Sequence, residues 1–235
     1  MFLTVRHFYT HCAMAEKCNF VMDPGGDVLL TLSNPDAPFA VWEDSGGVRQ
    51  LETVKQLEAP EDGPAPGPAP EMTFLLSSRH LSLASPVFET MLSGKWSEGL
   101  KVDSDLDSLY RVTAEDFDSE ALAMVMNVIH GRWSLVPRTV SLEMLARIAV
   151  IVDYYDIREA LQLILSLWMQ NLPVSSVPTS LSREGVLWIL VSWVFKNNAL
   201  FRQATKVAIL RSRHDLELPG DIPIPSSIIS KYCLT

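Results

Sequence analysis

The chain has 235 residues, a formal net charge of −9 and a pI near 5.0. Hydrophobic residues make up 48% of it and charged residues 20%, a globular composition that excludes a chain disordered throughout. The excess of acids argues against a long basic groove, so we expect no direct binding to nucleic acid.

Cysteine content and hydropathy bear on the compartment. The three cysteines, Cys12, Cys18 and Cys233, do not form a disulfide framework, which is typical of a reducing compartment. The longest apolar run, residues 185–195, is much shorter than the roughly 20 residues that cross a bilayer. We therefore expect a soluble intracellular protein in the cytoplasm or the nucleus, without a membrane partner.

The first third of the chain predicts little regular structure. Residues 1–22 carry only a weak pattern, and we expect a flexible N-terminus. An Asp-Pro-Gly-Gly turn then leads into a short aliphatic run at 27–32, which predicts a strand, and 39–42 predicts a possible second one. Because residues 59–71 contain five prolines, they indicate a linker, and we expect an insertion over about 35–71.

The middle of the chain predicts a strand followed by a helix pair. Residues 72–76 resume as a strand, and 77–83 predict a short helix. Ser85 is a suitable N-cap for the next helix, and Pro86 is tolerated at its first position. A further strand is expected at 110–113.

Helical periodicity dominates the rest of the chain. We expect one helix capped by Asp118 or Ser119 and others over about 141–152, 157–172 and 183–210, the last broken at Asn197–Asn198. Strands grouped early and helices grouped late favour an α+β fold over a parallel α/β fold.

Residues that could carry chemistry do not combine into a recognisable site. His7, His11, Cys12 and Cys18 lack the second ligand pair of a zinc site, so we expect no metal there. The acidic stretch that begins at Asp103 lacks the glycine and glutamate of a calcium loop and is interpreted as a solvated loop. Phosphate-loop and hydrolase motifs are absent from the sequence, so we expect no cofactor and no catalytic residues, and an enzyme is the disfavoured alternative.

The order and spacing of several residues resemble the BTB/POZ family. An Asp-Val strand start, a second strand and a Leu-x-x-x-Ser-x-x-Phe helix pair occur in the family's order. The residues that carry the resemblance, which we call the signature residues, are Asp27, Phe74, Leu81, Ser85, Phe88 and Tyr154. The resemblance covers 23–172 and implies a small sheet with a helical bundle, as in the stand-alone BTB proteins of filamentous fungi. Residues 173–235 are then expected to form an all-α C-terminal extension.

The chain departs from the family pattern after Phe74. The family often has a histidine and a basic residue where this sequence has Ser77 and Ser78. Asp27, which usually pairs with that basic side chain, therefore needs another partner, for which we expect Arg79. The departure also disfavours the charged pocket that some transcriptional members use for co-repressors.

The resemblance implies a non-enzymatic adaptor that forms a homodimer through its first helix and neighbouring strands and presents an unidentified partner. Trp96 and Glu98 resemble the apolar-x-Glu motif of members that bind a cullin scaffold, which implies a substrate adaptor for a ubiquitin ligase; a chance tripeptide in a solvated loop is the alternative. A nuclear regulatory, co-repressor-type scaffold unrelated to ubiquitin is the alternative function. The apolar stripe of Val186, Leu187, Leu190 and Val194 predicts either internal packing or a partner groove.

Overall fold

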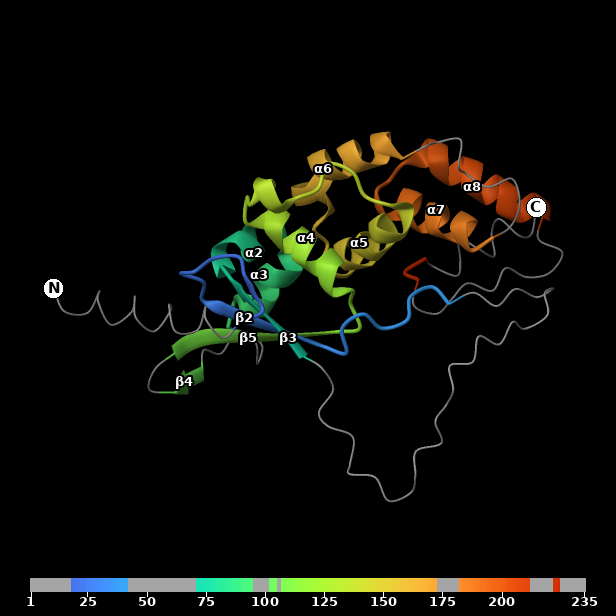
Figure 1. Ribbon diagram of the computed structural model, residues 1–235. Helices are drawn as coiled ribbons and strands as arrows, with labels where there is room; N and C mark the ends of the chain where they lie inside the picture. The colour runs from blue at the N-terminus through green and yellow to red at the C-terminus, as the bar shows by residue number, and fades with distance from the viewer. Residues whose placement is uncertain are drawn as a thin grey trace, which may run out of the picture.

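A small mixed sheet lies on one side of the molecule and helices cover one of its faces, which is an α+β fold as the sequence predicts (Figure 1). The computed structural model describes residues 18–41, 71–94, 102–104, 107–172, 182–211 and 222–224. The described strands are β1 (Phe20–Val21), β2 (Val28–Ser33), β3 (Glu71–Leu76), β4 (Val102–Ser104) and β5 (Asp107–Glu115), in the order β1-β3-β2-β5-β4.

The centre of the sheet is β2, which is antiparallel to β3 and parallel to β5. The turn before β2 is closed by Asp23, whose carboxylate accepts a hydrogen bond from Gly25 N at 2.9 Å. Gly26 has no room for a side chain, because a Cβ there would lie 2.5 Å from the carbonyl oxygen of Leu76. The turn is therefore closed by a local hydrogen bond, and the glycine at its end is required by the close approach of β3.

The described helices follow the sequence-based expectations closely. They are α2 (Ser78–Ala84), α3 (Pro86–Leu92), α4 (Ser119–Ile129), the 3-10 helix η2 (Trp133–Leu135), α5 (Leu142–Tyr154), α6 (Arg158–Asn171), α7 (Arg183–Val194) and α8 (Asn198–Arg211). The N-caps predicted at Ser85 and Asp118 are confirmed, since each side chain accepts a hydrogen bond from the first turn of its helix. The break predicted at Asn197–Asn198 is confirmed as well.

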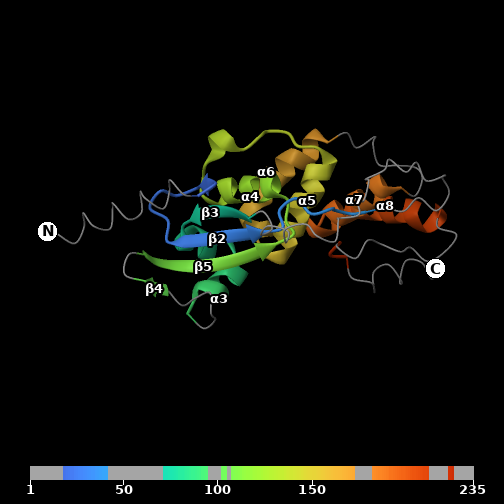
Figure 2. The same cartoon turned by 60° about the horizontal axis from the view of Figure 1, so that its bottom comes forward.

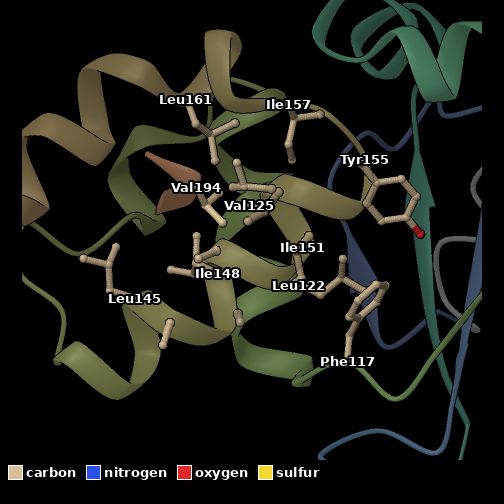
Figure 3. Close-up of a cluster of buried hydrophobic side chains, with 14 of the residues drawn as sticks. Phe117, Leu122, Val125, Leu145, Ile148, Ile151, Tyr155, Ile157, Leu161 and Val194 are labelled. Carbon is tan, nitrogen blue, oxygen red and sulfur yellow. The ribbon is translucent and has the colours of Figure 1, made fainter. Parts of the chain in front are cut away.

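One apolar core joins the sheet to all the helix layers, and Figure 3 shows its helical part. In that view α5 supplies Leu145, Ile148 and Ile151 to the centre of the cluster, and Val194 of α7 reaches the same centre. Helix α7 is buried almost all round, and the four residues of its apolar stripe lie inside this core. The stripe therefore serves internal packing and does not form a partner groove.

Three segments differ from their sequence-based interpretation. β1 lies within 1–22, the segment expected to be flexible, because Phe20 stacks on Phe74 with ring centroids 4.6 Å apart. The strand predicted at 39–42 is wrong for 39–41, where the backbone is irregular and Ala40 has a φ of 48°. The acidic stretch begins as a strand pair instead of a loop, because β4 and β5 form an antiparallel ladder.

Candidate interaction surface

Asp27 fixes the start of helix α2, although it lies 51 residues earlier in the sequence. Its carboxylate accepts hydrogen bonds from Ser78 N and Ser78 Oγ, both at 2.8 Å. The expected pairing with Arg79 is therefore wrong: the carboxylate serves the unpaired N–H groups at the helix N-terminus, where a negative charge is favoured. Ser77 holds the backbone position of the N-cap, but its side chain makes no cap hydrogen bond.

His130 binds a second N–H group at the same helix start. Its Nε2 accepts a hydrogen bond from Ser77 N at 3.0 Å, so Nδ1 carries the proton and donates to the carbonyl of Met126 at 2.8 Å. Burial lowers the pKa of His130, the Met126 carbonyl opposes this, and the nearby His80 ring, 5.0 Å away, lowers the pKa further. The ring is thus a neutral strut that links α4 to α2.

Ser85 joins the corner between α2 and α3 to the end of α5. Its Oγ donates to the carbonyl of Tyr155 at 2.5 Å and accepts from Phe88 N at 3.0 Å. The rings of Phe88 and Tyr155 stack with centroids 4.2 Å apart. This contact explains why a serine and a phenylalanine are needed three residues apart.

The tyrosine in this contact is the neighbour of the one selected from the sequence. Tyr154 is 62% exposed, whereas Tyr155 is fully buried and its hydroxyl has no hydrogen-bond partner. Burial raises the pKa of Tyr155 well above its ordinary value. The periodicity contained this signal, since position 155 continues the buried face of Ile148, Ile151 and Val152 at helical spacing.

The other signature residues also serve the fold. Phe74 and Leu81 have no exposed surface, and both belong to the apolar core. Among the signature residues, Asp27 and Ser85 anchor α2 and α3 by hydrogen bonds, Phe74, Leu81 and Phe88 are buried in the core, and only Tyr154 is largely exposed. Trp96 and Glu98 lie outside the described residues, between the end of α3 and the start of β4.

Arg183 at the start of α7 makes a contact that the sequence did not indicate. Its guanidinium binds both carboxylate oxygens of Glu143, at 2.6 and 2.7 Å, and donates to the carbonyls of Phe39 and Ala40. These bonds, with burial opposing them, hold the pKa of Glu143 below its ordinary value. The same hydrogen bonds account for the irregular backbone at 39–41. The carbonyls of Phe39 and Ala40 accept from the Arg183 side chain and not from a neighbouring strand.

Two features of the described surface could contact another molecule. Large apolar side chains protrude into solvent, with Leu83 of α2 90% exposed and Leu163 of α6 84% exposed. A groove of about 560 Å³ lies between α6 and the corner of α7 and α8. Its lining includes both apolar and amide side chains, among them Leu165, Met169, Leu200, Gln162, Gln170 and Gln203. Such a lining can pack apolar groups and hydrogen-bond to a peptide backbone.

The described residues contain no metal centre. Among them, no group of three His, Cys, Asp or Glu side chains is close enough to hold an ion. Cys18 is the one described member of the His7, His11, Cys12 and Cys18 set; it is partly buried, and burial raises the pKa of its thiol. Within the same ranges, no helix combines the length and the apolar character needed to cross a membrane.

Comparison with known proteins adds no relative to this picture. Neither a family model nor a curated protein sequence matches the chain.

Proposed function

We propose that this chain is a non-enzymatic interaction module of the BTB/POZ type, which forms a homodimer and presents a second protein. The observation that carries the proposal is the anchoring of α2 and α3 at three points. Asp27 and His130 hold the start of α2, and Ser85 holds the corner before α3. Two of the signature residues, Asp27 and Ser85, thus act together with His130 in one structural unit.

The geometry supports a docking role because the anchored unit ends in exposed apolar surface. Leu83 stands on α2, between the start held by Asp27 and the corner held by Ser85, and is almost fully exposed. A short helix fixed at both ends presents such a side chain in one orientation, which lowers the ordering cost of binding. A stable dimer through surfaces of this kind buries roughly 2,000 Å² or more.

The sharper form of the proposal is a substrate adaptor for a cullin-type ubiquitin ligase, with Trp96 and Glu98 at the contact. The experiment is a pull-down of a cullin scaffold with the purified full chain. Glu98→Ala should lose the captured scaffold, while Glu89→Ala, an exposed acid on α3, should keep it. No capture by the wild type, or equal capture by both variants, would discard the cullin version.

The alternative is a nuclear scaffold that acts through the same dimer without ubiquitin. The position that would supply the basic side chain of the co-repressor pocket holds Ser78, whose hydroxyl donates to Asp27. This contact weighs against the alternative. Proximity labelling in cells distinguishes the two versions, since one expects ubiquitin-ligase subunits and the other chromatin regulators among the labelled proteins.

A further inference from the structure

Strand β5 uses only half of its backbone hydrogen-bonding groups for its neighbour β2. Tyr110 N donates to the carbonyl of Asp27 at 2.9 Å, and Asp116 N donates to the carbonyl of Ser33 at 3.2 Å. Since the backbone groups of successive residues in a strand point to alternate sides, the even-numbered residues of β5 face β2. The N–H and C=O groups of Arg111, Thr113 and Glu115 therefore point away from β2.

The outer edge of β5 is paired with β4 over its first residues and, among the described residues, has no partner strand after that. β4 matches β5 only from Asp107 to Leu109, and Figure 2 shows β4 beside the beginning of β5. Among the described residues, no strand pairs with the outer side of residues 111–115. An unpaired strand edge is a template on which another strand can add.

The side chains along this edge favour one particular occupant. Arg111, Thr113 and Glu115 are all exposed and share one face of the sheet. If two copies of the edge run antiparallel with Thr113 opposite Thr113, Arg111 of each copy lies directly opposite Glu115 of the other. Opposite charges at such positions stabilise a strand pair, so the segment is complementary to itself.

We propose that residues 111–115 form a self-association edge, on which β5 of a second copy adds in antiparallel register centred on Thr113. Three residue pairs would then face each other with their outward groups and exchange about six backbone hydrogen bonds. Other registers that match outward groups place Arg111 or Glu115 opposite Thr113 and lose both charge pairs. The two copies continue the sheet across a two-fold axis.

This edge lies on β5, whereas Leu83, the exposed side chain on which the docking role of the proposed function rests, lies on α2. A five-residue strand pair buries much less than a stable interface, so the association is weak and depends on concentration. Where a dimer already exists through another surface, the edge joins dimers to each other. A variant can therefore weaken one of the two interfaces without affecting the other.

A charge exchange tests the register. Arg111→Glu places Glu opposite Glu at two symmetric positions and should weaken association about tenfold, measured by sedimentation equilibrium over a range of concentrations. Arg111→Glu combined with Glu115→Arg should restore the wild-type value. Within one chain the two residues are about 13 Å apart along the strand, so the restoration must arise between copies. Unchanged association in the single variant, or no restoration in the double variant, overturns the proposal.

A disulfide test can trap even a weak association. In a background with Cys12, Cys18 and Cys233 replaced by Ser, Thr113→Cys should form a covalent dimer under mild oxidation, because facing residues of a hydrogen-bonded pair have Cα atoms about 5.5 Å apart. Arg111→Cys is the matched control and should stay uncoupled, since it faces position 115. Equal cross-linking of both variants, or of neither, contradicts the register, while a dimer that persists in solution without cross-linking leaves the proposed function standing.

Discussion

The two ends of the core are held together by different means. At the sheet end, α2 and α3 are fixed by directed hydrogen bonds from Asp27, His130 and Ser85. At the helical end, α7 is fixed mainly by burial of most of its circumference against the bundle, and Arg183 at its start adds an ion pair with Glu143. Hydrogen bonds set the orientation of a short helix pair, whereas apolar burial supplies most of the stability.

The comparison predicts that removing the helical end has the largest effect. A chain that ends at residue 175 should lose cooperative unfolding, because it exposes the faces that α7 covers, including Ile148 and Ile151 of α5. Denaturation followed by circular dichroism and dye binding checks this. A chain that ends at residue 211 is the control, and a cooperatively folding 1–175 fragment would contradict the single core.

Removing the remote helix cap should have a smaller effect. Asp27→Ala leaves the first N–H groups of α2 without their acceptor and should cost about 1–2 kcal/mol in the free energy of unfolding. Asp36 offers a matched comparison, since it accepts from Ser119 N and Ser119 Oγ at the start of α4. That contact is exposed, so Asp36→Ala should cost less in urea titrations; an equal or larger cost would remove the special role of the α2 anchor.

The neutral His130 ring between α4 and α2 predicts that the free energy of unfolding depends on pH. The pKa of His130 is lowered in the folded chain from its ordinary value of 6.5, so the unfolded chain takes up a proton first as the pH falls. The full contribution of the strut is present above pH 6.5 and is lost as the pH falls through the lowered pKa. Groups facing the ring are His80, Asp23 and Arg132.

Unfolding in urea at pH 7.5 and pH 5.5 measures this dependence. His130→Gln should reduce the loss of stability between the two pH values, whereas His80→Gln, at an exposed position, should retain most of it, because burial is the largest cause of the lowered pKa of His130. The same loss in wild type and His130→Gln would assign it to other groups.

The smallest effect on stability is expected at Tyr155, which both accepts a hydrogen bond from Ser85 through its carbonyl and is buried in the core. Tyr155→Phe removes a buried hydroxyl that has no partner but keeps the ring stacked on Phe88, so stability should be unchanged or rise by about 1 kcal/mol. Thermal unfolding measures the change, with Tyr154→Phe as the exposed control. A clear loss of stability in Tyr155→Phe would mean that the hydroxyl has a role.

Local sequence predicted the features that depend on neighbouring residues. The N-caps at Ser85 and Asp118 and the break before α8 are each set within a few residues, so a pattern reveals them. Contacts between residues far apart in the sequence could not be predicted from such local patterns. Asp27 lies 51 residues from Ser78, and Arg183 lies 143 residues from Ala40. The prediction of Arg79 as the partner of Asp27 failed because it considered charge and not the free N–H groups of a helix start.

Light scattering of the Arg111→Glu variant tests the central claim most directly, because this variant weakens the association through the β5 edge. If the chain is a homodimerising interaction module, the variant should have twice the 26.2 kDa mass of one chain across a wide range of concentrations. A mass of one chain at every concentration would contradict the account.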